Sequence, residues 1–543
     1  MRKVFSPLAR LNRRDVFRRG GLLALPAFWQ RRPAAATPAA AGLQVGPDIY
    51  RSIGIKPLIN CRGTLTIVGG SLELSEVRAA KEAAAQHYVH LDEMMDAIGR
   101  RLAELTGAEW GIVTSGCAAA IAHATAACVA GANPDLHVRI PNLAGFAKDE
   151  VIIPKQFRTV YDAAVRSIGV KVIEIETAGE LEAALGSPRV AMIYYYAGRI
   201  TTGPLLLDSV AAMARKRNVP VFVDAAAEDL TIPNVHLQKG ASLVGYSGGK
   251  SLRGPQCAGL LLGRKDLVQA AWMHSAPHHG YGRSMKVGKE EAIGMLMAVE
   301  MWARRDHDSE WKTWVSWLDN ISKRLTAIPG VTADVRQPRG LSNHSPGLTI
   351  RWDPVKFGIS GEEVAEYLYT TEPRIALGGG GGAAGRGAQN GLTSISISAS
   401  MMGPGNDKVV ADRIYEVLSK PRPPKHPQEL KPPAIDLNGI WDVHIDFIAG
   451  STQHTLSIKH DGNRLAGIHQ GDFVGRDLSG TIDGEAVRIY SNIPDNSSGD
   501  HLEFTFTGKV NGDAMSGDLD AAEYFKARWT AQRHTPRPGL PVR

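Results

Sequence analysis

The sequence predicts an α/β protein with a mostly parallel sheet, followed by a small α+β domain and then by an antiparallel β-barrel or sandwich. Between residues 110 and 273, short apolar runs alternate with helical segments, which is the pattern of βαβ units. A proline-rich stretch at 421–434 reads as a stiff extended linker. Beyond it, short alternating segments are interrupted by Asp461-Gly462, Asp483-Gly484 and Asn511-Gly512, which are dipeptides of tight hairpin turns.

The large domain is expected to span residues 43–309, after a signal segment at 1–42. Its strands are expected at 110–114, 150–153, 170–175, 190–196, 219–223, 241–246 and 257–262. Its helices are expected at 75–105 (two, broken near His90), 117–129, 161–168, 178–185, 208–217, 265–273 and 290–305.

The small domain is expected at 310–420, and an all-β domain of about eight strands at 435–534. The small domain should hold helices at 310–327, 360–369 and 406–419 and strands at 331–336, 346–352, 374–377 and 393–398. The glycine run 378–382 is either a flexible crossover, which we favour, or a lid near a site. The all-β domain shows no cluster that promises chemistry, so a docking or stabilising role is expected for it.

Charge is concentrated at the start of the chain. The 543 residues carry a formal net charge of +7, but residues 1–32 hold nine Lys/Arg against Asp15 alone. The remaining 511 residues therefore carry about −1, and this balance argues against a nucleic-acid partner.

Residues 1–42 have the three parts of a secretory signal. Arg13-Arg14, with Phe17 after them, precede an apolar run at 20–29 and an alanine-rich stretch at 33–41. Twin arginines favour the Tat route, so a periplasmic or secreted protein is expected; the alternative is a disordered basic tail. The apolar run is too short to span a bilayer, and no other membrane span is predicted.

The four cysteines, Cys61, Cys117, Cys128 and Cys257, lack metal-site spacing, and no metal is predicted. An oxidising compartment would permit disulfides. Cys117 and Cys128 fall on one predicted helix, however, so buried free thiols are expected.

An acid and an amine follow two neighbouring predicted strands. Asp224 ends the run 219–223, and Lys250 follows the next run, 26 residues after Asp224. The carboxyl ends of such strands are where open α/β sheets bind ligands. The pair suits pyridoxal 5′-phosphate (PLP), since a carboxylate can pair with the pyridinium nitrogen and an amine can form the Schiff base. The alternative is an unrelated strand-end aspartate and a surface lysine.

A phosphate cradle is predicted at the turn from a strand into the helix at 117–129. Ser115, Gly116 and Cys117 place free N–H groups and a positive helix end toward an anion. Ser247 could add a hydroxyl donor, and Ala226 is small enough to lie against the ring, although a core alanine is equally compatible.

Several motifs resemble the fold-type I PLP family of bacterial selenocysteine synthase, in particular its D-glucosaminate-6-phosphate ammonia-lyase branch. They lie at 59–64, 114–120, 224–228, 247–256, 263–267 and 282–291, and the resemblance covers roughly 48–420. It implies Lys250 as the Schiff-base lysine, a large and a small domain, and sites built at the interface of a homodimer or higher oligomer. The signal segment and the β domain lie outside the match.

Other polar residues have two interpretations each. Arg283, Lys286 and Lys289 form either a solvated face or an anion site for a substrate carboxylate or phosphate. His279, with His278 before it, lies in a glycine-bounded loop and is either exposed or an acid/base near the substrate.

The expected function is that of a PLP-dependent lyase. It would act on a small-molecule amino acid or amino sugar acid by removing the Cα proton and eliminating a β-substituent. Fold-type I enzymes often carry a carboxylate-binding arginine on a late strand, and the segment 394–398 has none, which weakens an aminotransferase interpretation. A transferase (β-replacement or transamination) and, in another class, a non-catalytic exported scaffold protein stay as alternatives.

Overall fold

The computed structural model describes residues 42–378, 391–424, 429–493, 503–524 and 526–535. Residues up to Pro57 form a unit of their own, in which the described element is the short 3-10 helix η1 (Arg51–Ile53). The second unit runs from Leu58 to the end of the chain and holds three separate hydrophobic cores.

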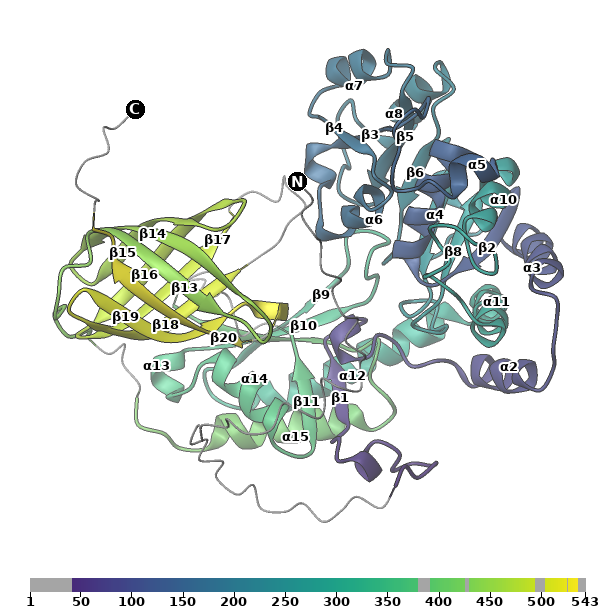
Figure 1. The fold of residues 1–543 in the computed structure, drawn as a ribbon. Helices are drawn as coiled ribbons and strands as arrows, with labels where there is room; N and C mark the ends of the chain where they lie inside the picture. The colour runs from purple at the N-terminus through teal and green to yellow at the C-terminus, as the bar shows by residue number, and fades with distance from the viewer. Residues whose placement is uncertain (1–41, 379–390, 425–428, 494–502, 525, 536–543) are drawn as a thin grey trace, which may run out of the picture. The chain divides into compact units, whose positions relative to one another are not determined.

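The first core surrounds a seven-stranded sheet of order β2-β8-β7-β6-β5-β3-β4 (Figure 1). Every pairing is parallel except the two made by β8. The mostly parallel sheet predicted from the sequence is therefore confirmed. Its strands are β2 (Trp110–Thr114), β3 (Glu150–Pro154), β4 (Lys171–Ile175), β5 (Val190–Tyr196), β6 (Val221–Asp224), β7 (Leu243–Ser247) and β8 (Gly259–Gly263).

Helices cover this sheet because each buries one apolar face. The alanine-rich α4 (Cys117–Ala130) packs across β5 to β8, and its small side chains let the helix approach the strands closely. The other helices are α2 (Ser75–Ala85), α3 (Leu91–Thr106), α5 (Pro134–His137), α6 (Ala163–Arg166), α7 (Ala178–Ala184), α8 (Leu207–Arg215), α9 (Val235–Gln238), α10 (Lys265–Met273) and α11 (Lys289–Arg304). Three 3-10 turns join them: η2 (Thr66–Val68), η3 (Lys155–Phe157) and η4 (Val160–Asp162). The helix expected at 161–168 is shorter and begins in η4, where the Thr159 side chain caps the Tyr161 N–H.

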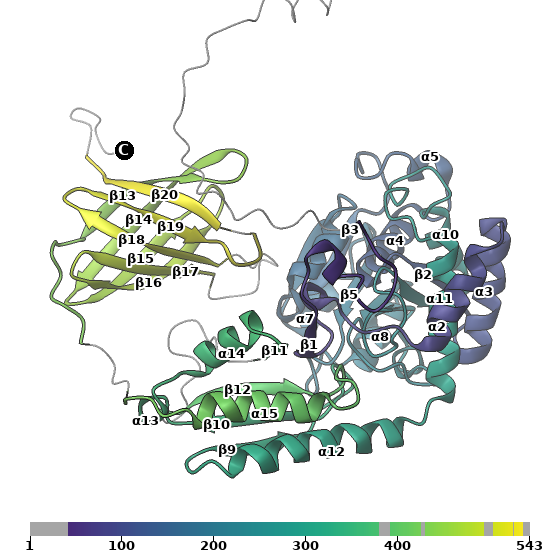
Figure 2. The same cartoon turned by 90° about the horizontal axis from the view of Figure 1, so that it is seen from below.

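The second core lies in an α+β domain (Figure 2). An antiparallel sheet of order β12-β10-β9 is built from β9 (Thr332–Arg336), β10 (Gly347–Trp352) and β12 (Thr393–Ser398). Its helices are α12 (His307–Thr326), α13 (Pro354–Phe357), α14 (Gly361–Thr370) and α15 (Asn406–Ser419). The strand β1 (Leu58–Cys61) pairs in parallel with β11 (Arg374–Leu377), so this early strand joins the small domain, where Cys61 is part of the core. Of the glycine run 378–382, Gly378 bridges to Ser396 and the rest lies outside the described residues.

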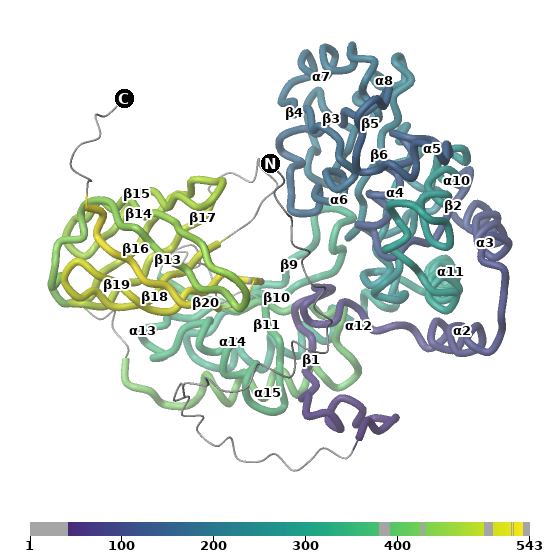
Figure 3. The backbone as a smooth tube through the Cα atoms, viewed as in Figure 1, coloured from purple at the N-terminus to yellow at the C-terminus, as the bar shows by residue number. Residues whose placement is uncertain are grey.

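The third core fills a closed eight-stranded antiparallel barrel, and Figure 3 shows the path of the chain through its strands. The structure thus selects the barrel over the sandwich. Trp441, Phe506 and Trp529 are buried inside it, where alternate residues of each strand point. The strands are β13 (Gly439–Asp446), β14 (Ser451–Asp461), β15 (Arg464–Gln470), β16 (Gly475–Asp483), β17 (Ala486–Asn492), β18 (Phe504–Asn511), β19 (Ala514–Asp520) and β20 (Lys526–Arg533), with η6 (Ala522–Tyr524) before the last.

The cysteines are all free, as expected, but they are not all buried. Cys61, Cys117 and Cys128 are buried, whereas Cys257 is exposed. Within the described residues, no helix is both long and apolar enough to cross a lipid bilayer. No group of three or more His, Cys, Asp or Glu side chains suited to a metal ion occurs in the same part of the chain.

Candidate active site

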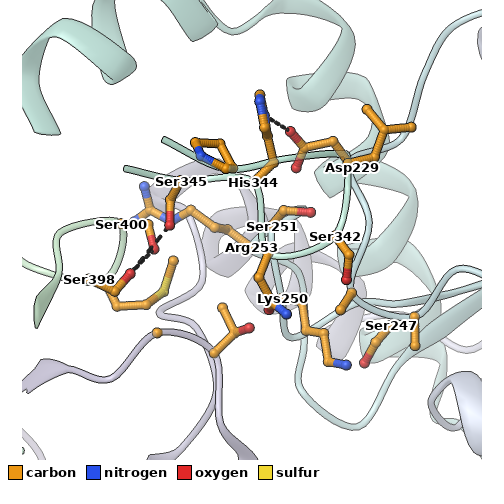
Figure 4. A pocket seen from close by; sticks show the side chains of 18 of the residues that line it. Asp229, Ser247, Lys250, Ser251, Arg253, Ser342, His344, Ser345, Ser398 and Ser400 are labelled. Atoms are coloured by element: carbon orange, nitrogen blue, oxygen red, sulfur yellow. Dashed lines mark hydrogen bonds and ion pairs between the residues drawn. The ribbon is translucent and has the colours of Figure 1, made fainter. Parts of the chain in front are cut away.

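One cavity lies at the carboxyl ends of parallel strands of the large sheet. Asp224 is the last residue of β6 and Ser247 the last of β7, and β6 and β7 pair with Asp224 beside Gly245. The cavity measures about 1420 Å³, and both Asp224 and Lys250 line it. Figure 4 shows Lys250 and Ser247 in this cavity. The acid and the amine therefore face the same cavity, as binding of one cofactor to both requires.

Asp224 is a buried carboxylate held in a fixed orientation. The Tyr194 hydroxyl donates to its Oδ2 at 2.6 Å, and the Ala226 N–H donates to its Oδ1 at 3.1 Å. The Cys117 thiol contacts Oδ1 at 3.6 Å. Burial raises the pKa of the Asp224 carboxyl, and the hydrogen bonds from Tyr194 and Ala226 oppose this rise.

No cation among the described residues forms an ion pair with Asp224. The Lys250 charge opposes the effect of burial on the pKa of Asp224 without pairing directly with the carboxylate, and a buried carboxylate that has no directly paired cation is costly because it is desolvated. The protonated nitrogen of a pyridinium ring would supply that partner, so the donor set at Asp224 fits PLP.

Lys250 lies in a tight turn directly after β7. The Gly248 N–H donates to the Ala258 carbonyl at 2.8 Å, and the Arg253 N–H donates to the Lys250 carbonyl at 3.0 Å. A Cβ on Gly249 would lie 2.6 Å from the Gln256 Cα, so the turn closes only with glycine at this position. The Lys250 amine makes no hydrogen bond or ion pair with any described residue. It is therefore free to bond to an aldehyde carbon.

The phosphate cradle forms at the start of α4. Gly116 has φ +95°, a conformation that favours glycine, and it turns the chain from β2 into the helix. A Cβ on Gly259 of β8 would lie 2.5 Å from the Gly116 carbonyl carbon, so glycine at 259 lets this loop sit against the sheet. Gly116 and Cys117 line the cavity, whereas Ser115 is not among its lining residues. The start of α4 thus lies at the cavity wall, where its first N–H groups would bind a phosphate as helix N-termini do.

The predicted contacts at Ala226 and Ser247 are both on the cavity wall. Ala226 follows Asp224 by two residues, and its N–H holds the carboxylate, so its side chain stands next to the acid. These residues, with Gly116, Cys117, Asp224 and Lys250, are brought together as the sequence analysis expects.

Two relatives of known activity align with most of their length. The chain is 31% identical over 332 residues to "D-glucosaminate-6-phosphate ammonia lyase" of Salmonella typhimurium, covering 59% of this chain and 87% of the relative. It is 30% identical over 382 residues to "5'-C-glycyluridine monooxygenase-decarboxylase" of a Streptomyces species, covering 68% of this chain and 92% of the relative. The chain belongs to the D-glucosaminate-6-phosphate ammonia-lyase and selenocysteine synthase family.

The solved structure "D-Glucosaminate-6-phosphate Ammonia-lyase" agrees, with a TM-score of 0.60 and 26% identity over 68% of this chain and 98% of that one. No protein-family model matches the chain. Members of this family are PLP enzymes, so PLP is the cofactor and the chain is an enzyme. Asp224, Lys250 and the start of α4 are the residues that would hold it.

The residues at 278–289 that were predicted to bind an anion or act as acid/base do not line the cavity within one chain. Arg283, Lys286 and His279 are exposed and are not among the lining residues. Lys289 donates to the Ala84 carbonyl at 2.8 Å, and His278 lies 3.3 Å from an Asp92 oxygen. The proposed roles of these residues in anion binding or acid/base chemistry stay predictions that depend on a second subunit.

Sequence reasoning missed Tyr194 and Arg253. Tyr194 is fully buried in strand β5, where it is one of three consecutive tyrosines, and nothing in the sequence singles it out from Tyr195 and Tyr196. Arg253 lines the cavity three residues after Lys250 and has φ +55°, which is uncommon outside glycine. Its closeness to Lys250 was the available signal.

Proposed function

We propose that the protein is a PLP-dependent lyase that removes the Cα proton of an amino acid or amino sugar acid and eliminates a β-substituent. The observation that supports this most is the similarity to an ammonia lyase over 87% of that relative, combined with the cavity shared by Asp224 and Lys250. The cavity is lined by six Lys/Arg and four Asp/Glu side chains, which suits a polar, anionic amino substrate.

The bound cofactor supplies an electron sink for the negative charge that develops at Cα. Asp224 keeps the ring nitrogen protonated through its fixed Oδ1 and Oδ2, which maintains this sink. Lys250 Nζ, when it is not bonded to the cofactor, would receive the Cα proton as general base. The same ammonium can then protonate the departing β-substituent. Hydrolysis of the enamine that elimination leaves then gives ammonia and a keto product.

The cofactor assignment is tested with the purified mature protein. We expect a visible absorption band that bleaches with borohydride and is absent in Lys250→Ala, because that substitution removes the amine that bonds to the aldehyde. Lys289→Ala is the matched control, since its amine is bound to the Ala84 carbonyl and does not line the cavity. A colourless protein that ignores added PLP would contradict the assignment.

The reaction type is tested by product analysis across amino acids and amino sugar acids. A lyase releases ammonia and a keto acid without a second substrate. A transferase, favoured by relatives such as the selenium transferase of Proteus mirabilis (26% identical, 55% of that protein covered), needs an acceptor or nucleophile. A decarboxylase that uses oxygen, as the name of the Streptomyces relative describes, would consume O₂ and release CO₂.

We also propose that the protein is exported by the Tat route and works as a homodimer or higher oligomer. The support for export is the twin-arginine segment at 13–19, and export of a folded chain suits a protein that loads its cofactor first. Replacing Arg13 and Arg14 by Lys should hold the protein in the cytoplasm of the producing cell. Sedimentation of the holoenzyme should give more than one chain per particle, and a monomer that retains full activity would contradict the second proposal.

A further inference from the structure

Arg253 presents an ordered, partly free guanidinium to the cavity. Its Nε donates to the Leu72 carbonyl at 3.1 Å, and its own carbonyl accepts from the Leu74 N–H at 3.2 Å. Among the described residues, no hydrogen bond is found for its Nη1 or Nη2. The side chain is therefore held at Nε, and Nη1 and Nη2 are left available to donate hydrogen bonds to a carboxylate or a phosphate in a bidentate manner.

A row of serine hydroxyls lies on the same cavity wall. Ser345 and Ser398 are 3.3 Å apart, and Ser398 and Ser400 are 3.2 Å apart, measured between their Oγ atoms. Figure 4 shows these serines with the Arg253 side chain extending toward them. Arg253 and Ser400 also both line a neighbouring cavity of about 650 Å³, which supports their closeness. A row of three hydroxyls can turn donors toward an oxyanion.

Arg305 adds a buried cation to the wall of the cavity that the half-buried Arg253 also lines. Its side chain is only 9% exposed, and it stacks on the Trp302 ring at 4.9 Å. Its Nη2 donates to the Ser251 carbonyl at 3.3 Å and lies 3.5 Å from Glu310, while Nε and Nη1 are buried and have no hydrogen-bond partner among the described residues.

The two guanidinium groups are close enough to repel each other. Burial lowers the pKa of Arg305, and the charge of Arg253 lowers it further. Glu310 opposes this shift and is the one carboxylate within 4 Å of Arg305 among the described residues. Glu310 and Asp229 favour the charged form of Arg305, and Glu310 and Glu76 favour that of Arg253, so the positive charge is partly compensated. The buried Nε and Nη1 of Arg305 still lack acceptors within the described residues, and the oxygen atoms of an anionic ligand would supply them.

We propose that Arg253, supported by Arg305 and by the hydroxyls of Ser345, Ser398 and Ser400, binds an oxyanion of the substrate, either a carboxylate or a phosphate monoester. This site supplies the cation that the late strand β12 lacks, from the loop after Lys250. The inference rests on the proposed function, because it assigns the substrate-binding side of the same cavity.

Phosphate and acetate binding to the holoenzyme tests the site. Treatment with borohydride first fixes the cofactor covalently, so that an added anion cannot exchange with the cofactor's own phosphate. Inorganic phosphate and, separately, acetate are then titrated while the fluorescence of the cavity tryptophans, among them Trp302 beside Arg305, is followed. Tighter phosphate binding indicates a phosphate monoester, and tighter acetate binding indicates a carboxylate.

We expect Arg253→Met to weaken binding of the preferred anion about ten- to a hundred-fold, because hydrogen bonds to a charged group are lost. Arg305→Met should weaken it in the same direction. Arg304→Met is the matched control, since Arg304 is the exposed neighbour that pairs with Glu300 at 2.7 Å and should leave binding unchanged.

The results separate this inference from the cofactor assignment. If the unmodified protein shows no visible absorption band, the assignment of PLP as the cofactor is contradicted. A normal band with anion binding unaltered in Arg253→Met, or with no binding of either anion to the unmodified protein, overturns the anion site. Where Arg253→Met does not load the cofactor, Ser400→Ala decides: a several-fold loss of binding supports the site, and unchanged binding overturns it.

Discussion

Replacement of Tyr194 by phenylalanine tests how the protein sets the charge of its cofactor site. The Tyr194 hydroxyl donates to Asp224 at 2.6 Å, and both side chains are buried, Tyr194 fully and Asp224 with 3% exposure at the cavity wall. The substitution removes one oxygen atom and leaves the ring in the core. Asp224 then keeps the Ala226 N–H and the Cys117 thiol as donors.

The magnitude follows from the kind of bond that is lost. A hydrogen bond to a charged group is worth about 1.5–3 kcal/mol, and the side chain that makes this one is fully buried. The loss falls on the ionised form of Asp224, which the bound ring nitrogen requires, and much less on the protonated form. The pKa of the Asp224 carboxyl, already raised by burial, therefore rises further in Tyr194→Phe. At about 1.4 kcal/mol for each factor of ten, PLP affinity should fall by roughly ten- to a hundredfold.

The assay is a PLP titration of the apoprotein followed by the visible band, together with turnover at saturating PLP. Tyr195→Phe is the control on the same strand, because its hydroxyl donates to the Leu205 carbonyl at 3.2 Å and not to Asp224. It should lose some stability and keep its affinity for PLP. The reasoning is refuted if Tyr194→Phe binds PLP and turns over as well as Tyr195→Phe does.

Two further predictions concern packing and pH. In Gly259→Val the new Cβ would lie 2.5 Å from the Gly116 carbonyl carbon, so the loop at the start of α4 must move. PLP should then bind about tenfold more weakly, and pyridoxal, which lacks the phosphate, should be affected less. Equal effects on both ligands would show that this loop does not hold the phosphate. In the barrel, burial lowers the pKa of His469 to about 3, with the nearby charges of His454 and Arg476 adding to the shift. The unfolded barrel therefore binds a proton that the folded barrel does not, and stability that is complete above about pH 6.5 should fall by about 1.4 kcal/mol per pH unit below it. Hydrogen exchange in β14–β17 peptides, corrected for its intrinsic pH dependence, measures this fall, and His469→Gln should lessen it; an unchanged slope in the variant would contradict the assignment.

The sheet and the cofactor residues could be predicted because their signals are local. Each strand of the large sheet is an apolar run, and Asp224 and Lys250 come directly after two of these runs. The pairing of β1 with β11 could not be predicted, since the two strands are more than 300 residues apart and each is only four residues long. Periodicity identifies a strand, but it does not identify the partner that completes its hydrogen bonds.

The residues proposed to bind the substrate anion could not be predicted from the sequence for a related reason. The missing arginine on β12 weakened an aminotransferase interpretation and gave no sign of Arg253, which the fold brings from the loop after Lys250 into the cavity that Ser398, at the end of β12, also lines. The cofactor groups are set by strand ends of one sheet, whereas the anion groups come from loops of two domains. Substitutions in the second set can therefore leave the first set in place. The same division predicts that variants at Tyr194 change PLP affinity and turnover, while variants at Arg253 raise KM for the anionic substrate and leave the visible band intact.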